Sequence, residues 1–143
     1  MLRFAREKRY PLSRQGNLLL LRAAAGAADG RGHVLRMILD TGSAHTLLPP
    51  SVLEELGCDL GHPVRTVPII TAMGVVSVPE VILPWFHCAG HRIERWPVLA
   101  YKLPAPFSRF CDGLLGMNFL TRFQVTIVLD QARSAEIILR IPD

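Results

Sequence analysis

A single aspartate in this chain stands where a carboxylate could carry out acid–base chemistry. Asp40 ends the apolar run 37–39 and is followed by Thr41, Gly42 and Ser43. A strand that is apolar at consecutive positions is covered on both faces, so Asp40 would lie at the end of a core strand. An ionised carboxylate there needs hydrogen bonds, and the two hydroxyls and the glycine N–H could supply them. The same residues also fit an ordinary turn after a strand, so the flanking sequence has to decide.

Short apolar runs separated by turns predict the elements that must position Asp40. The chain has 143 residues, of which 50% are hydrophobic and 20% are charged, which fits one folded domain. Such runs between glycine- and proline-containing turns favour strands. The expected strands are 17–24, 34–40, a hairpin over 66–84 with its turn at 72–74, 91–101, 124–130 and 135–141; the expected helices are 49–57 and a short one within 112–123. The sequence therefore predicts a mostly β domain with one or two short helices.

The charge distribution gives little support to nucleic acid or membrane partners. The net charge is +4, and four basic residues lie within residues 1–10, so we expect a basic N-terminal arm at 1–14 before a domain at 15–143. A single short cluster without a known groove-binding motif does not indicate nucleic acid binding. No apolar run reaches the roughly 18–20 residues of a membrane span. Arg22 interrupts 17–28, the one stretch that could be read as a signal peptide.

Cysteine and histidine usage predicts neither disulfides nor a metal site. Cys58, Cys88 and Cys111 are odd in number and lack a close pairing pattern, which favours a reducing compartment and a cytoplasmic location. His87, Cys88 and His91 lie close together in the sequence, but structural zinc takes four ligands with paired short spacings. The Ala-Gly between them is typical of a hairpin turn. We therefore expect no metal and no cofactor.

Three stretches together resemble one protein family. They are MILDTGSAHTLLP (37–49), the glycine-tipped hairpin IITAMGVVSV (69–78) and DGLLGMNFL (112–120). In this order and spacing they resemble the retropepsin-like aspartic proteases, the single-domain branch of the pepsin-like enzymes. The resemblance extends over about residues 15–141. It implies a single-domain, closed barrel-like β fold with a flap hairpin, assembled as a homodimer.

The resemblance also implies roles for particular residues. Asp40 would be the catalytic aspartate, and Thr41 would brace the two active-site loops against each other. Gly42 would offer a backbone contact to substrate, while Ser43 would hydrogen-bond the outer oxygen of Asp40. The flap that closes over a peptide would comprise Ala72, Met73, Gly74 and Val75, and the strand that supports the catalytic loop would comprise Leu114, Leu115 and Gly116.

A single aspartate motif predicts a homodimer. Aspartic proteases need two carboxyls that share a proton, so that one accepts a proton from water while the other polarises the scissile carbonyl. The sequence has no second Asp-Thr-Gly or Asp-Ser-Gly, because Asp112-Gly113 lacks the hydroxyl residue. Two copies of Asp40 would therefore meet on a two-fold axis.

The chain departs from the viral members of this family at two positions. The viral acidic residue after the serine is replaced by Ala44, and the arginine after the apolar-apolar-glycine motif is replaced by Met117. Both partners of an ion pair are thus absent together, and no lone charge is stranded. The dimer interface should therefore rely more on apolar contact, with residues 135–143 as the natural candidate for a shared sheet.

Two functions are compatible with the sequence. The first is an aspartic endopeptidase that hydrolyses an extended peptide or protein substrate by general acid–base activation of water. The second is a catalytically silent dimerisation or peptide-binding module with the same fold. The intact Asp-Thr-Gly-Ser favours the endopeptidase, because a binding module does not need a desolvated carboxylate pair.

Overall fold

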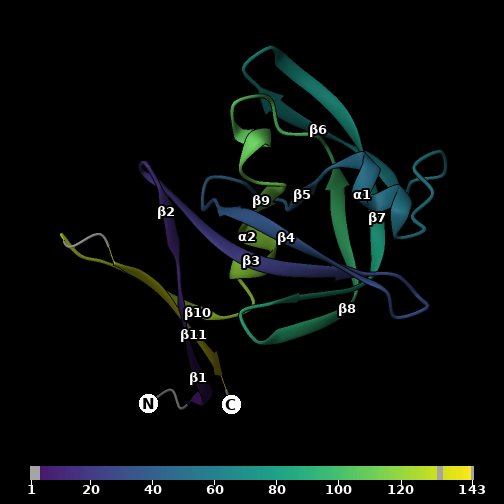
Figure 1. The fold of residues 1–143 in the computed structure, drawn as a ribbon. Helices are drawn as coiled ribbons and strands as arrows, with labels where there is room; N and C mark the ends of the chain where they lie inside the picture. Colours follow the sequence, from purple (N-terminus) through teal and green to yellow (C-terminus); the bar gives the residue numbers. More distant parts are fainter. Residues whose placement is uncertain (1–3, 132–133, 143) are drawn as a thin grey trace.

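The computed structural model describes residues 4–131 and 134–142, and most of its regular structure is β-strand (Figure 1). The short helices are α1 (Pro50–Glu55), η1 (Phe107–Arg109) and α2 (Met117–Leu120). The strands are β1 (Phe4–Pro11), β2 (Ser13–Gln15), β3 (Leu18–Gly26), β4 (Gly32–Leu39), β5 (Leu47–Leu48), β6 (Arg65–Thr71), β7 (Gly74–Cys88), β8 (His91–Ala100), β9 (Gly113–Leu115), β10 (Gln124–Leu129) and β11 (Ala135–Pro142). The predicted hairpins and the helices near 49–57 and within 112–123 are confirmed. Among the described residues, no helix is long and apolar enough to cross a membrane.

Eight of the strands form a sheet that closes on itself. Their order is β2-β3-β4-β9-β5-β8-β7-β6, and β3 pairs in addition with β7. This extra pairing runs from Ala23 opposite Cys88 to Gly26 opposite Trp85. The six strands from β3 round to β7 therefore make a closed ring. The predicted closed, barrel-like and mostly β fold is confirmed.

Aromatic side chains pack in the interior, and buried apolar side chains of α1 and α2 attach these two helices to it. Phe86 stacks on Trp96 with ring centroids 4.4 Å apart. Phe119 of α2 meets these two rings edge-on, at 6.0 and 6.1 Å. α1 begins with proline in its first turn, where no backbone donor is needed, and it buries Val52 and Leu53. Both helices are thus held by side chains that they place in the core, because each is too short to be stable alone.

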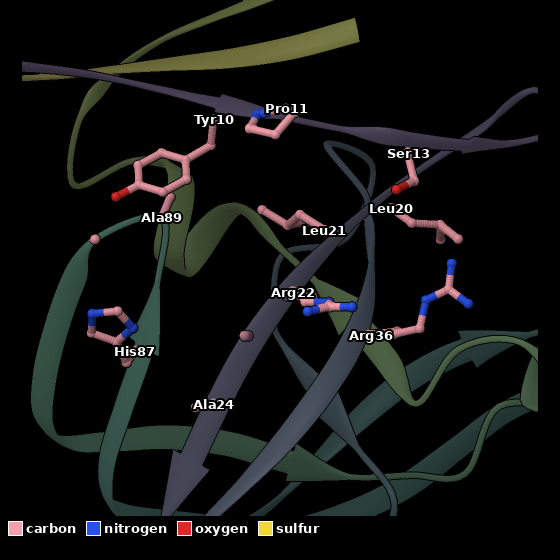
Figure 2. A pocket seen from close by; sticks show the side chains of 12 residues that line it. Tyr10, Pro11, Ser13, Leu20, Leu21, Arg22, Ala24, Arg36, His87 and Ala89 are labelled. Atoms are coloured by element: carbon pink, nitrogen blue, oxygen red, sulfur yellow. The ribbon is translucent and has the colours of Figure 1, made fainter. Parts of the chain in front are cut away.

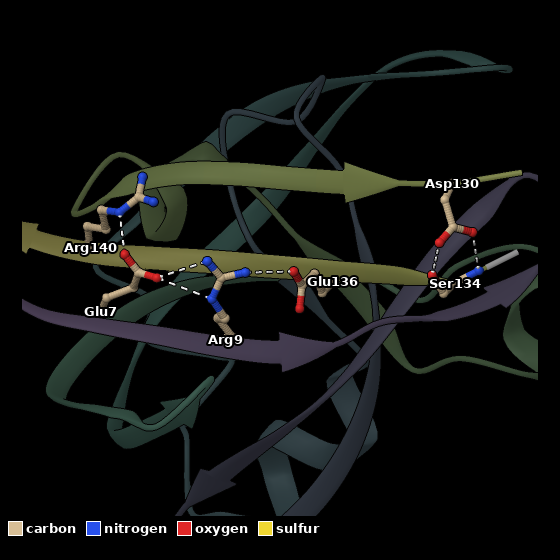
Figure 3. A network of polar contacts seen from close by, with 6 residues as sticks. All are labelled: Glu7, Arg9, Asp130, Ser134, Glu136 and Arg140. Atoms are coloured by element: carbon tan, nitrogen blue, oxygen red, sulfur yellow. Dashed lines mark hydrogen bonds and ion pairs between the residues drawn. The ribbon is translucent and has the colours of Figure 1, made fainter. Parts of the chain in front are cut away.

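The two ends of the chain form a separate three-stranded sheet in the order β1-β11-β10. On this sheet Arg140 donates from Nε to Glu7 at 2.7 Å, and Arg9 bridges Glu7 and Glu136 (Figure 3). The stretch expected as a solvated basic arm is therefore a paired strand from residue 4 to residue 11. β11 offers this strand a backbone edge, and the charge of Arg9 is paired with Glu7 and Glu136.

β11 lies in the middle of the terminal sheet, which differs from the expectation for the C-terminal segment. It is hydrogen-bonded to β1 along one edge and to β10 along the other. Since both edges are occupied within the chain, β11 cannot extend a sheet into a partner. The outer edges of β1 and β10 remain, and Val128 and Leu129 on β10 are 40% and 54% exposed. A shared sheet would have to use one of these two edges.

A histidine lies where the terminal sheet meets the barrel. His91 of β8 packs on Phe123 with ring centroids 4.4 Å apart. Burial lowers the pKa of His91 from its usual value, and three basic neighbours act in the same direction: Lys8, His87 and Arg6. The folded protein therefore binds this proton less readily than the unfolded chain. Neutral His91 therefore contributes to the free energy of unfolding at neutral pH. This contribution is lost as the pH falls below about 6.5, the ordinary pKa of histidine.

Replacing His91 with phenylalanine should reduce this acid-side loss, because the ring contact is kept and the titrating group is removed. We expect wild type to lose more free energy of unfolding than His91→Phe between about pH 7.5 and pH 5.5, as measured by urea denaturation. His62→Gln, which changes an exposed histidine, should lose at least as much free energy of unfolding over this pH range as wild type does. Equal losses in wild type and His91→Phe would contradict this assignment.

Candidate active site

Backbone hydrogen bonds hold Asp40 at the end of β4. Its N–H donates to the carbonyl of Leu115 at 3.0 Å, and its carbonyl accepts from the N–H of Ser43 at 3.2 Å. The carboxylate oxygen Oδ1 accepts from the N–H of Gly42 at 2.8 Å. The loop after β4 is therefore a tight turn that fixes the orientation of the carboxylate. No hydrogen bond to its other oxygen, Oδ2, is found within the described part of the chain.

β9 supports this loop at a distance that only glycine allows. It runs parallel to β4, with Gly113 opposite Met37 and Leu115 opposite Leu39. A Cβ on Gly113 would lie 1.9 Å from the carbonyl oxygen of Leu47, and one on Gly116 would lie 2.1 Å from that of His45. Both neighbours are backbone atoms, so a larger residue at Gly113 would push β9 away from β5 (Leu47–Leu48), and one at Gly116 would push the end of β9 away from the Asp40 loop.

A buried threonine ties the loop to α2. Thr46 is fully buried, and its hydroxyl accepts from the N–H of Gly116 at 3.2 Å and donates to Oδ1 of Asn118 at 2.8 Å. The amide of Asn118 in turn donates to the carbonyl of Pro97 on β8 at 3.4 Å. At the start of α2, the N–H of Met117 donates to the carbonyl of Ser43 at 2.7 Å. The loop that carries Asp40 is thus fixed from one side by β9 and from the other by α2.

Thr46 and Asn118 were not predicted as site residues. Each had a local signal, since Thr46 is a polar residue directly before two leucines and Asn118 stands two places after Gly116. Buried polar side chains of this kind need partners, but nothing in the sequence indicates that the two lie together.

The two hydroxyl residues next to Asp40 differ in their surroundings. Ser43 donates from Oγ to the carbonyl of His45 at 2.7 Å. The expected hydrogen bond from the Ser43 hydroxyl to the Asp40 carboxylate is therefore absent, because the hydroxyl donates to the His45 carbonyl instead. Thr41 and Gly42 are exposed, and the Thr41 hydroxyl has no hydrogen-bond partner among the described residues.

The flap hairpin β6–β7 lies over a cleft that also contains Asp40. At its tip, Thr71 pairs with Gly74, which has a φ of +111° that favours glycine. The Thr71 hydroxyl donates to the Gly74 carbonyl at 2.9 Å and accepts from the N–H of Met73 at 3.2 Å. Met73 and Ile70 are 94% and 89% exposed. The hairpin therefore presents apolar side chains on a hydrogen-bonded turn.

The cleft has a volume of about 820 Å³, and only some of the site residues predicted from the sequence line it. From that set it is lined by Asp40, Gly42, Ser43, Ala72, Met73 and Leu114. Thr41, Gly74, Val75, Leu115 and Gly116 do not line it. Leu115 and Gly116 act behind the loop through the backbone contacts described above. Within the described residues, no group of three or more acidic, histidine or cysteine side chains could hold a metal.

A sequence model of the aspartyl proteases matches residues 26–119, which is more than half of the chain and contains both the Asp40 loop and the flap. The chain belongs to the aspartyl protease family. A search of curated proteins gave no match to this aspartyl protease.

Two solved structures are similar to this aspartyl protease. A retropepsin-like aspartic protease from Rickettsia conorii is 19% identical, with a TM-score of 0.66, and the similarity covers 99% of this chain and 98% of that one. The protease of Simian Foamy Virus (mac) is 23% identical, with a TM-score of 0.46, over 73% of this chain and 98% of the viral one. The first comparison establishes a retropepsin-like fold.

Thr46→Val should destabilise the protein although it conserves side-chain shape. The substitution removes the hydroxyl that the buried Gly116 N–H donates to, and it leaves Oδ1 of the partly buried Asn118 without its donor. We expect a loss of about 2 kcal/mol in the free energy of unfolding, measured by urea denaturation. Thr126→Val, at an exposed position of β10, is the matched control and should stay within about 0.5 kcal/mol of wild type. A Thr46→Val protein as stable as this control would contradict the proposed tie between loop and helix.

Proposed function

We propose that this aspartyl protease is an endopeptidase whose catalytic dyad consists of two Asp40 side chains, one from each protomer of a homodimer. One chain supplies a single aspartate of the required kind. Thr41 and Gly42 stand exposed beside it, on a face that a second copy could cover. A two-fold axis next to Asp40 would place identical carboxyls together without any further motif.

The observation that carries the proposal is the state of the Asp40 carboxylate. Gly42 holds Oδ1 through its N–H, whereas Oδ2 has no protein partner in the described residues. The carboxylate also lines the cleft beneath the flap. The backbone thus orients one oxygen of the carboxylate and leaves the other free to accept a hydrogen bond. A carboxylate that shares a proton with a second carboxyl or with water needs such a free oxygen.

In the proposed reaction the two carboxyls divide the work. Two carboxyls within a few ångströms cannot both ionise easily, so the pair holds one proton between them. The ionised member accepts a proton from water, which then attacks the scissile carbonyl carbon, while the protonated member donates to the carbonyl oxygen. When the tetrahedral intermediate collapses, the carboxyl that took the proton from water gives it to the leaving amine, the other carboxyl regains its proton from the hydroxyl on the former carbonyl carbon, and the C–N bond breaks.

The cleft supports an extended peptide with apolar side chains as the substrate. Its walls include Leu47, Ile69, Tyr101 and Leu103. β6 is the last strand of the eight-stranded sheet, so its outer edge is available to pair with a peptide backbone. Met73 at the exposed tip of the flap would be covered when substrate is bound.

We assign the enzyme to the cytoplasm on the basis of its thiols. Cys58, Cys88 and Cys111 are all free, as a reducing compartment allows. Burial raises the pKa of Cys88 to about 12, so this thiol stays protonated and unreactive.

Asp40→Asn tests the catalytic role of the carboxylate. The substitution keeps the size of the side chain and removes the titrating group. Cleavage of a mixed peptide library should fall by at least about 1000-fold, with folding and the mass of the particle unchanged. The measurement is peptide mass spectrometry, with the particle mass determined by light scattering in the same buffers.

Asp59→Asn is the matched control, because it removes an exposed carboxylate that lies outside the cleft. This variant should cleave as wild type does. Persistent cleavage by Asp40→Asn would refute the assignment. A folded wild-type dimer that cleaves no peptide would instead favour a binding module.

A further inference from the structure

A second cavity of about 710 Å³ lies on the outer face of the barrel and shares no lining residue with the Asp40 cleft (Figure 2). It opens at a gap along β3. β2 pairs with residues 18–20 of that strand and β7 pairs with residues 23–26, so no strand in the described part of the chain pairs with Leu21 and Arg22 on this edge. The chain passes over the gap as it goes from β1 to β2, and Tyr10 and Ser13 line the cavity there.

Two arginines face each other across neighbouring strands in this cavity. Arg22 on β3 is the register partner of Arg36 on β4, and both side chains line the cavity. Side chains directly opposite in an antiparallel pair have Cβ atoms roughly 4.5–5.5 Å apart, and like charges there are destabilising. Both side chains are exposed, so water screens part of this repulsion, and an anion between the two guanidinium groups would turn it into attraction.

Neither guanidinium has an ion pair among the described residues, in contrast to several other arginines of the chain. Arg9, Arg31, Arg65, Arg92 and Arg140 each meet a carboxylate within 4 Å. The carboxylate next in sequence to β9, Asp112, accepts from the backbone N–H of Arg36 at 2.8 Å and does not line the cavity. The positive charge of the pair is thus left open to the cavity.

Further basic and polar groups surround the same space. His87 of β7 lines the cavity opposite Ala24, and Figure 2 shows its ring on the far side from Arg36. At the rim, Lys8 donates from Nζ to the carbonyl of Gly90 at 2.8 Å. None of the described acidic residues lines the cavity, and the rest of its wall is largely apolar: Pro11, Leu20, Leu21, Ala23, Ala24 and Ala89.

We propose that this cavity binds a small organic phosphate, with its phosphate group between Arg22 and Arg36 and its apolar part over the alanine and leucine wall. A phosphomonoester carries a charge of about −1.5 to −2 at neutral pH, which matches two guanidinium groups better than the single charge of a carboxylate. Guanidinium groups also bind phosphate oxygens in a bidentate geometry. The volume lies within the roughly 300–1,000 Å³ of small-molecule sites. The inference does not rest on the proposed proteolytic function.

The test is calorimetric titration of the full chain with 1-naphthyl phosphate in a low-salt chloride buffer. We expect one site per chain, with a Kd below about 1 mM. The double variant Arg22→Gln/Arg36→Gln should bind at least about tenfold more weakly. Arg109→Gln/Arg122→Gln makes the same change in net charge at exposed positions outside the cavity and should bind as wild type does. Asp40→Asn should also bind normally, which separates this site from the cleft.

Three results would overturn the proposal: no binding to wild type, an equal loss in both double variants, or binding of 1-naphthoate as tight as that of the phosphate.

Thermal melting gives a second readout that does not need the double variant to be well folded. In chloride buffer, Arg22→Gln alone should melt at a higher temperature than wild type, because it relieves the like-charge contact. Added 1-naphthyl phosphate should then raise the melting temperature of wild type more than that of Arg22→Gln. A larger rise in the variant would also refute the site.

Discussion

The close approach of β9 to the Asp40 loop is the contact on which the rest of the site depends. Gly113 and Gly116 lie so near the carbonyls of Leu47 and His45 that no Cβ fits between them. This approach lets the Leu115 carbonyl accept the N–H of Asp40. It also brings Thr46 within reach of the Gly116 N–H. The carboxylate is therefore positioned by backbone atoms and one buried hydroxyl, which is the preorganisation that the proposed reaction needs.

A second constraint is that the sequence contains a single Asp-Thr-Gly motif, so the acid–base pair that we propose needs a second chain. Among the described residues Oδ2 of Asp40 has no hydrogen-bond partner, and the neighbouring Thr41 is exposed. The terminal sheet limits how a partner could attach, since β11 is enclosed between β1 and β10. Assembly through the face beside Asp40 and assembly through the outer edge of β1 or β10 are both compatible with a two-fold axis. In either case the viral ion pair is not needed, as Ala44 and Met117 stand in its place.

Local patterns in the sequence were sufficient to predict the strands and the hairpin that carry the site. The apolar run before Asp40 and the glycine at the flap tip each act over a few residues, so the β4 strand and the β6–β7 hairpin were predicted. Features that depend on long-range pairing were not. Thr46 and Asn118 are 72 residues apart in the chain. β1 meets β11 across almost the full length of the chain, which is why the basic arm was not recognised as a strand. The Arg22–Arg36 pair follows from the β3–β4 register, which neither residue reveals by itself.

The most direct test of the two-chain dyad is a subunit-mixing experiment. A fixed amount of wild type is equilibrated with increasing amounts of Asp40→Asn, and cleavage per wild-type chain is measured. If each active site needs one Asp40 from each protomer, random pairing lowers cleavage to about half at equal amounts and to about one tenth at a tenfold excess of variant. Cleavage that stays constant at every ratio would show that one chain forms a complete site by itself, and it would contradict the account.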